Sequence, residues 1–279
     1  MKRRLITIFL VVIAALICFP VLMVVAGSIK DADELRTLLL PLFTDSIERI
    51  RFRLIPNYPT LKNFIELLIF TPQFYAVFWN SIKIVFSILI LQLLMAVPGA
   101  WGFARFRFKG KNILFNLYVI LMLMPFQVTM LSQYLVLDRI RMMNTQWAVI
   151  LPAAFSTFPI FLIYRGYCGI PADLVEAAKI DGANELMVFR YIALPLGSSG
   201  ILSAMVLGFL EYWNLMEQPL AFLKDKTLWP LSLYLPEVTT TQAGVVLAAS
   251  VITLIPATLV FIMGQDYLEK GIIASALKE

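Results

Sequence analysis

The chain has 279 residues, of which 60% are hydrophobic and 15% are charged, and its mean hydropathy is +0.84. This charged fraction is too low to cover a soluble globule of this length, so apolar side chains must face lipid. The net charge of +5 needs no nucleic-acid partner, because basic residues beside membrane spans usually hold loops in the cytoplasm.

Composition also excludes several kinds of chemistry. The sequence has no histidine, which removes Ser-His-Asp catalysis and histidine-containing zinc sites. Its two cysteines, Cys18 and Cys168, fall within the first apolar run and beyond the fourth, an arrangement unsuited to a structural disulfide. No P-loop is present, since Arg105 stands where the first glycine before Gly110-Lys111 would be. We therefore expect no catalytic residue, no metal site and no cofactor on this chain.

Six stretches of the chain carry no charged residue, and each is near the length of about 20 residues that crosses about 30 Å of hydrocarbon. A charge at the centre of a membrane helix costs about 2.5–3.5 kcal/mol, so the absence of charges from all six is informative. None shows the alternation of a barrel strand, and we predict an all-α integral membrane fold of about six transmembrane helices. The stretches are Leu5–Ala26, Ile84–Phe103, Ile113–Leu137, Asn144–Tyr164, Tyr191–Leu210 and Ala243–Gly264.

The first span, at about 5–26, is expected to be retained. Its 22 uncharged residues exceed the 7–15 of a signal-peptide core, although Lys2–Arg4 and a small-residue exit resemble one. An extracytoplasmic segment at about 27–74 should follow and be folded, and the core spans should occupy about 75–266. No internal repeat is visible, so a single domain over 1–279 is the economical interpretation.

Basic residues indicate the orientation. Lys2–Arg4 precede the first span, and the loop after the second contains four basic residues and no acid between Arg105 and Lys111. Short loops of this kind usually lie in the cytoplasm, which predicts that both termini are cytoplasmic. The other basic loop residues would then lie outside, and we give the short loops more weight.

Prolines and polar residues between the fourth and fifth runs predict a helix-turn-helix at about 167–196, here called the hairpin. Pro171 suits a first helical turn, and glycine at Asp181-Gly182 tolerates the positive φ of a helix end. Asn184 can cap a second short helix. Leu186, Phe189 and Ile192 are expected on one side of that helix, and Pro195 should let the chain return to the membrane.

A polar and aromatic cluster surrounds the end of the fifth run. Sugars bind to aromatic faces and planar hydrogen-bonding groups, so this cluster is a candidate solute path, and the alternative is an interfacial anchor. Gln127 and Asn80 are weaker candidates for the same path. The path candidates in the cluster are Glu211, Tyr212, Trp213, Asn214 and Gln218, and the cluster also contains Glu217.

The hairpin also carries a motif. Glu176-Ala177-Ala178, then Gly182, then Ile192-x-Leu194-Pro195 resembles the EAA loop of bacterial ABC-importer membrane subunits, with all seven positions at the family spacing. Further segments narrow the resemblance to the carbohydrate-uptake permeases of the maltose-transporter type. These segments are Asn80–Lys83, Gly102–Gly110 with Gly102 for the usual alanine, Met124–Val128, and Trp213-Asn214 followed by Pro219-Leu220.

The resemblance implies a bacterial inner-membrane permease subunit that imports a sugar or oligosaccharide and docks on a partner ATPase through the hairpin. It implies a second homologous permease, two ATPase subunits that hold ATP and Mg, and an external solute-binding protein. One alternative is a peptide or amino-acid importer of the same architecture. Another is a self-sufficient secondary transporter, which should show inverted repeats and midplane ionisable residues that are not evident.

Overall fold

The computed structural model describes residues 2–43, 53–234 and 242–276. The chain divides into two compact units, one of Met1–Ala76 with Tyr234–Pro256 and one of Val77–Leu233 with Ala257–Glu279. That residues 1–279 form one domain stays a prediction.

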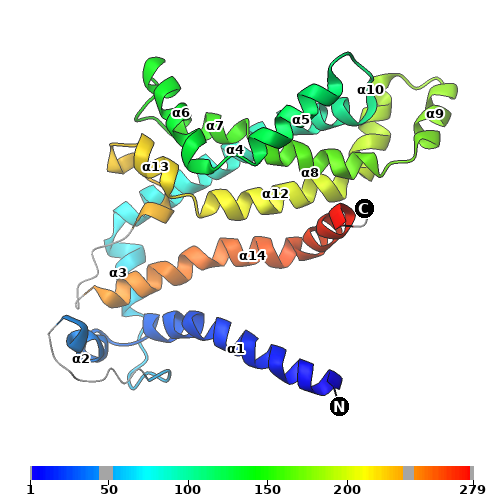
Figure 1. Cartoon of the computed structure of the whole chain (residues 1–279). Helices are drawn as coiled ribbons and strands as arrows, with labels where there is room; N and C mark the ends of the chain where they lie inside the picture. Colours follow the sequence, from blue (N-terminus) through cyan, green and yellow to red (C-terminus); the bar gives the residue numbers. More distant parts are fainter. Residues whose placement is uncertain (1, 44–52, 235–241, 277–279) are drawn as a thin grey trace. The chain divides into compact units, whose positions relative to one another are not determined.

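The regular structure of the described residues is helical, apart from an isolated antiparallel bridge between Lys30 and Pro59. The all-α prediction is therefore confirmed (Figure 1). The α-helices are α1 (Lys2–Ser28), α2 (Ala32–Phe43), α3 (Lys62–Phe70), α4 (Pro72–Arg105), α5 (Lys111–Met122), α6 (Phe126–Arg139), α7 (Gln146–Ala154), α8 (Thr157–Cys168), α9 (Ala172–Ile180), α10 (Glu185–Val188), α11 (Leu194–Leu196), α12 (Ser198–Trp213), α13 (Glu217–Phe222) and α14 (Ala243–Ala276). A π-helical turn spans Phe189–Ala193, and 3-10 turns span Lys226–Leu228 and Leu231–Leu233.

Four stretches of the described chain are helical, long and apolar enough to cross a membrane: Arg4–Ser28, Pro72–Arg105, Gln146–Cys168 and Ala243–Glu269. Two bent helix pairs, Lys111–Met122 with Phe126–Arg139 and Glu185–Leu196 with Ser198–Trp213, raise the number to six when each pair counts as one span. The expected set of about six spans agrees with this range.

Prolines explain why one span is broken. The expected third span, Ile113–Leu137, consists of α5 and α6 with a bend of 103° between them. Pro125 precedes α6, lacks the N–H of a continuing helix and disfavours helical backbone at Met124 before it. The expected fourth span is also interrupted, at Phe155–Ser156 between α7 and α8.

In the first unit, the residues that follow α1 are fastened by a buried ion pair. The Lys30 side chain is fully buried, and its Nζ donates to Glu34 Oε1 at 2.8 Å. The Asn57 N–H donates to the other Glu34 oxygen at 3.0 Å, and Asn63 Nδ2 donates to the carbonyl oxygens of Ser28 and Lys30 at 2.9 Å. These contacts fold the described parts of the segment at 27–74, while residues 44–52 lie outside the described chain.

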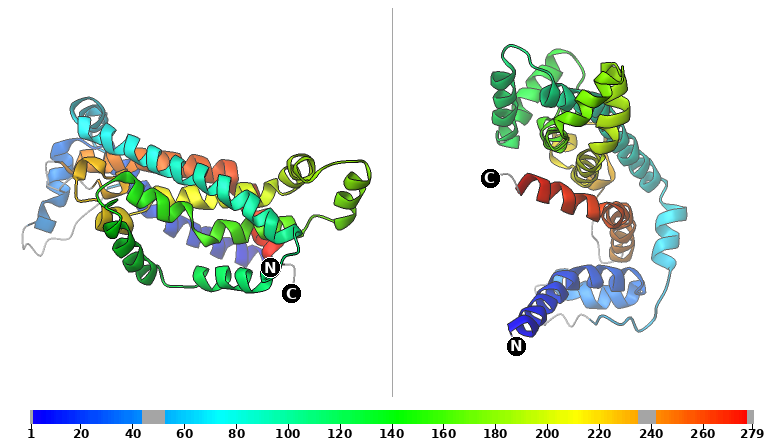
Figure 2. Two further views of the ribbon diagram at one scale, coloured as in Figure 1. Left: turned by 90° about the horizontal axis from the view of Figure 1, so that it is seen from above. Right: turned by 90° about the vertical axis from the view of Figure 1, so that its right-hand side faces the viewer.

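In the second unit, α12 packs along α8 (Figure 1). The two helices approach closely because glycines face each other, and a Cβ added to Gly166 would lie 3.3 Å from the Gly200 Cα. Helix α5 also packs on α8, and α7 packs on α13. Figure 2 shows α9 projecting at one end of this unit, beyond the ends of α8 and α12.

Candidate functional site

The first candidate site is the hairpin, and its bend is formed as the sequence predicts. Helix α9 ends at Ile180 with Asp181 as its C-cap, and Gly182 has φ +88°. The Gly182 N–H donates to the Lys179 carbonyl at 3.1 Å and the Ala183 N–H to the Ala178 carbonyl at 2.9 Å, the two bonds of a Schellman motif. A side chain with a Cβ is strained at this φ, which is why a glycine stands here.

The second helix of the hairpin begins with the predicted cap. Asn184 has extended backbone, and its Oδ1 accepts the Met187 N–H at 2.8 Å. Lys179 and Glu185, on the two sides of the bend, form an ion pair between half-exposed side chains. The bend is therefore held by backbone, cap and side-chain interactions within a few residues of one another.

One face of the hairpin is buried in the second unit. Val175 of α9, together with Val188 and Ala193 of the second helix, joins a core cluster that contains Trp101 and Tyr167. Three buried side chains at three places along the hairpin attach both of its helices to the bundle. Movement of the hairpin must therefore displace this cluster.

The prediction for the apolar side of the second helix was partly wrong. Phe189 and Ile192 pack against the buried cluster, but Leu186 is 73% exposed. The reason is that Val188 is fully buried, and Leu186 is two positions before it, about 200° around the helix and so on the opposite face. Ile180 and Tyr191 are also exposed, so the hairpin presents apolar side chains away from the bundle.

The seven motif positions are distributed over both faces of the hairpin. Glu176, Ala177, Gly182 and Pro195 are exposed, whereas Ala178, Ile192 and Leu194 are partly buried against the cluster. The chain does not turn at Pro195 itself, because the helix continues to Leu196 and bends by 65° at Gly197. Here the Tyr167 ring occupies the space that a Cβ on Gly197 would need.

Two fastening residues of the hairpin lie far from it in the sequence and were not predicted. Arg105 Nη2, at the end of α4, donates to the Ala172 carbonyl at 3.2 Å, and its guanidinium lies 5.9 Å from the Trp101 ring. Trp101 packs edge-on against Tyr167 with ring centroids 5.3 Å apart. In the sequence Arg105 was a basic loop residue within the Gly102–Gly110 segment, and nothing local indicated this contact.

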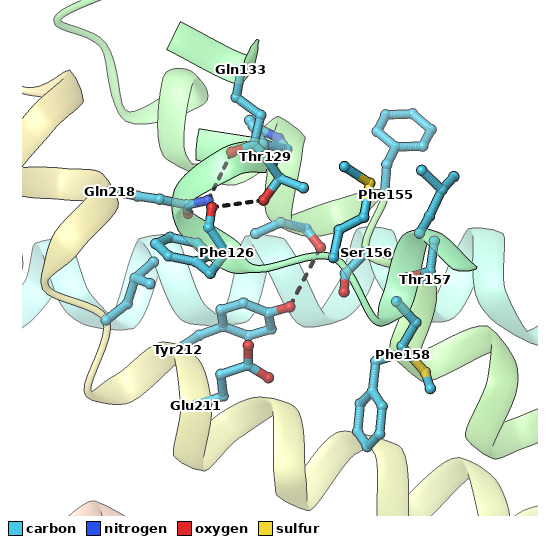
Figure 3. A pocket seen from close by; sticks show the side chains of 16 residues that line it. Phe126, Thr129, Gln133, Phe155, Ser156, Thr157, Phe158, Glu211, Tyr212 and Gln218 are labelled. Carbon is cyan, nitrogen blue, oxygen red and sulfur yellow. Dashed lines mark hydrogen bonds between the residues drawn. The ribbon is translucent and has the colours of Figure 1, made fainter. Parts of the chain in front are cut away.

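The second candidate site is a cavity of about 500 Å³ in the second unit, lined by helices α5, α6, α7, α8, α12 and α13 or their connections. Figure 3 shows Gln133 and Gln218 near Phe126, the residues Phe155–Phe158 around the break between α7 and α8 on the other side, and Tyr212 and Glu211 below them. Gln218 Nε2 donates to Gln133 Oε1 at 3.0 Å. The lining therefore combines aromatic faces with neutral hydrogen-bonding groups and the carboxyl group of Glu211.

A buried glutamine holds the wall of this cavity. Gln92 of α4 is 4% exposed, and its Nε2 donates at 2.7 Å both to the Ala153 carbonyl and to the Tyr212 hydroxyl. Ala153 lies in the last turn of α7, where its carbonyl accepts the Ser156 N–H at 3.1 Å and has room for the side-chain donor of Gln92 as well. Gln92 is an isolated polar residue in a charge-free run, and that was the signal by which the sequence could have identified it.

The structure brings three of the seven path candidates to the cavity, namely Glu211, Tyr212 and Gln218. Trp213 is buried, stacked on Phe209 at 5.5 Å and edge-on to Phe78 at 6.1 Å. Asn214 caps its own helix by donating to the Leu210 carbonyl at 2.9 Å. These contacts place Trp213 and Asn214 outside the lining.

Asn80 and Gln127 also lie outside the lining. Asn80 Nδ2 donates to the carbonyl oxygens of Thr227 and Trp229 at 2.7 and 3.1 Å, and its Oδ1 accepts from Gln146 at 2.9 Å. These bonds fasten the 227–229 turn to α4. Gln127 is exposed on the first turn of α6.

A family model described as "Binding-protein-dependent transport system inner membrane component" matches residues 1–274. The arabinooligosaccharides transport system permease protein AraQ of Halalkalibacterium halodurans is 30% identical over 288 residues, which cover 100% of both chains. The lactose transport system permease protein LacG of Rhizobium radiobacter is 30% identical over 202 residues, which cover 71% of this chain and 74% of LacG.

The fold is also similar to a solved structure of a bacterial ABC transporter involved in the import of the acidic polysaccharide alginate. The TM-score is 0.79 at 19% identity, and the match covers 95% of this chain and 96% of the solved one. At this identity the likeness concerns the fold alone.

Proposed function

Because the chain belongs to the family of binding-protein-dependent transport system inner membrane components, we propose that it forms half of the translocation pathway for a sugar or oligosaccharide. Membership makes the chain a multi-pass inner-membrane permease subunit of the ABC type, which works with a binding protein and with ATPase on a separate protein. The resemblance found in the sequence is thereby confirmed. The observation that carries the pathway proposal is the cavity of about 500 Å³ in the second unit.

The chemistry of the cavity favours a sugar. Its aromatic side chains, which include Phe126, Phe155 and Tyr212, offer faces for sugar rings, and Gln133 and Gln218 offer planar donors and acceptors for hydroxyl groups. A similar combination of apolar surface with few polar groups is typical of small-molecule sites. The names of the relatives AraQ and LacG, which refer to arabinooligosaccharides and lactose, support the same class of solute.

The proposed assembly contains this permease, a second homologous permease, two ATPase subunits that bind ATP and Mg, and an external solute-binding protein. The hairpin would lie on the cytoplasmic face with both termini, and its exposed face would dock on the ATPase. Ile180 is 86% exposed and Leu186 is 73% exposed, which is costly surface for a segment that faces only water. Glu176 beside them would meet a basic group of the ATPase.

The hairpin is suited to transmit movement because it is stiff. Its bend is fixed at Gly182 and Asn184, and its inner face is buried through Val175 and Val188. A displacement of the exposed face is then passed to Trp101 and Tyr167 in the bundle, whereas a mobile loop would absorb it.

The experiment that tests the function is uptake by the complete complex in proteoliposomes, with its binding protein and a panel of sugars, peptides and amino acids. We expect a sugar or oligosaccharide to enter and to stimulate ATP hydrolysis. Gln218→Ala should reduce uptake while the complex still assembles, since Gln218 lines the cavity. The same result for Trp213→Ala and Asn214→Ala would support their proposed place on the path.

Stimulation by peptides or amino acids alone would contradict the sugar proposal. Trp213→Ala also removes the stacking on Phe209, which costs about 3–5 kcal/mol for a buried tryptophan, so thermal stability is measured beside uptake. Uptake at the wild-type rate from Gln218→Ala would remove the cavity from the path.

A further inference from the structure

The cavity contains one charged group among the described residues that line it. Glu211 supplies a carboxylate, and the remaining lining side chains are apolar, aromatic, hydroxyl or carboxamide groups. No lysine or arginine belongs to that described lining. A solute in the cavity therefore meets negative charge from this chain and no compensating cation.

The Glu211 carboxylate is not neutralised within the described structure. The ion pairs found there, Lys30–Glu34 and Lys179–Glu185, involve other residues, and Glu211 is exposed on α12. Ionisable residues inside membrane bundles usually face the interior or water and mark solute or ion paths. Figure 3 shows Glu211 next to Tyr212, whose hydroxyl group is bound within the cavity wall.

We propose that Glu211 makes this half of the pathway selective for charge, so that the importer carries neutral or cationic sugars and rejects uronates and sugar phosphates. The inference rests on the proposed function, because it names the class of sugar that the same cavity accepts. Glu211 would determine specificity, and it lies in the cavity and not in the hairpin.

The size of the cavity makes the effect of one carboxylate strong. A space of about 500 Å³ is about 10 Å across, which is close to the Debye length of about 8 Å at physiological ionic strength, so salt screens the charge incompletely. An anionic solute would lose hydration there without gaining a paired cation, which is the unfavourable case for a buried charge. Neutral hydroxyl groups can instead donate hydrogen bonds to the carboxylate, and bonds of this kind are among the stronger ones.

The charge at the cavity can be measured without the binding protein. In the complete complex, Cys18 and Cys168 are replaced by serine, and Ser156, which lines the cavity, is changed to cysteine. The probes are the cationic trimethylammonioethyl and the anionic sulfonatoethyl methanethiosulfonates, which are of similar size. We expect the cationic reagent to react faster at position 156.

Glu211→Gln should lower the cationic-to-anionic rate ratio at least about tenfold, which corresponds to about 1.4 kcal/mol in the barrier difference. The matched control is Glu217→Gln, which removes a nearby exposed carboxylate on α13 outside the lining and should change the ratio less than about twofold. An unchanged ratio in Glu211→Gln, or an equal change in both variants, would overturn the proposal.

Uptake separates this result from the function itself. The wild-type complex should import a neutral sugar in preference to its uronate analogue, and Glu211→Lys should reverse the preference. If no sugar enters but another solute class does, the proposed function fails, while the rate ratio at position 156 still decides whether Glu211 sets the charge of the path.

Discussion

Gly182 sets the direction of the second helix of the hairpin, since its φ of +88° lies where L side chains are strained. No atom lies within 4 Å of a Cβ added there, so the constraint is conformational and not steric. Other residues act through side-chain contacts. Glu34 pairs with buried Lys30, and Gln92 donates a hydrogen bond to the Ala153 carbonyl inside the bundle. Substitution of Gly182 therefore tests backbone strain, and substitution of Glu34 tests charge.

Gly182→Val should uncouple transport from ATP hydrolysis. Valine at this φ costs about 1–2 kcal/mol locally and redirects the second helix. The variant should insert normally, lose uptake and either release the ATPase or keep it uncoupled, as measured by co-purification, uptake and binding-protein-stimulated ATP hydrolysis. Gly182→Asn is the control, because asparagine tolerates left-handed backbone and should retain most uptake.

Glu176→Lys should give the same loss, because it places a positive charge where a basic group of the ATPase is expected. Wild-type uptake from the Glu176→Lys, Gly182→Val double variant would show that the hairpin does not transmit the movement.

The ion pair between Lys30 and Glu34 should be lost at acidic pH. Burial alone would raise the pKa of Glu34, but the hydrogen bonds from Lys30 and from the Asn57 N–H outweigh it, and the pKa is lowered from its ordinary value. A carboxyl group with a lowered folded pKa adds stability above its unfolded pKa of about 4.3, and this stability is lost as the pH falls through the folded value.

We therefore expect the hydrogen-exchange protection of the Asn57 amide, corrected for intrinsic rates, to decline as the pH falls below about 4. In Glu34→Gln the protection should be low at neutral pH and nearly independent of pH. Asp33→Asn, an exposed change on the same helix, should keep the wild-type profile. An unchanged profile in Glu34→Gln would show that other contacts hold this segment.

Two helix interruptions, the gap between α7 and α8 and the bend at Gly197, shape the two candidate sites. The gap between α7 and α8 exposes Ala153 to Gln92 and forms one wall of the cavity. The bend at Gly197 joins the hairpin to α12 at the point where Tyr167 packs. A continuous helix at either place would remove the cavity wall or misdirect the hairpin. The proposed sites therefore depend on the places where these helices are interrupted.

Gly197→Ala tests the second of these junctions. Its methyl group would overlap the Tyr167 ring, and overpacking of this kind costs about 1–3 kcal/mol. We expect uptake to fall and thermal stability of the complex to decrease, with Tyr167→Leu partly restoring both by making room. Gly102→Ala is the matched control, because no atom lies within 4 Å of its added Cβ. Equal effects of the two alanine variants would contradict the packing argument.

At the scale of the whole molecule, the topology follows from the spans and from loop charge. Six spans, with the two bent pairs each counted once, return the chain to the side on which it began. The basic loop Arg105–Lys111 and the hairpin would then share the cytoplasmic side with both termini. The loops around Asp138 and Lys224 would lie on the other side.

Cysteine labelling in intact cells checks this topology. With native cysteines replaced by serine, an impermeant maleimide should label cysteine at positions 138 and 224 and spare positions 112 and 184. Labelling with permeable reagent is the control for accessibility, and all four positions are exposed. External labelling at 112 or 184 would reverse the orientation and remove the hairpin from the ATPase.

The features that the sequence determined by itself depend on residues close together in the chain. Apolar length predicts the spans, and Gly182 and Asn184 predict the bend of the hairpin, because backbone preference and capping act over a few residues. The break before α6 at Pro125, with its angle of 103°, was not predicted. Local sequence was also sufficient for the family, since its motif is a pattern of nearby positions.

Only the tertiary structure decided which polar side chains line the cavity. Tyr212 faces the cavity and its neighbour Trp213 packs on Phe209, a difference of one helical position that the rotation of α12 against its neighbours determines. Asn80 donates hydrogen bonds to carbonyl groups that lie 147 and 149 residues away in the sequence, and Arg105 donates to the Ala172 carbonyl 67 residues away. Such contacts depend on how the helices pack. Side chains point outward all around a helix, and the position of the neighbouring helices determines which of them are buried.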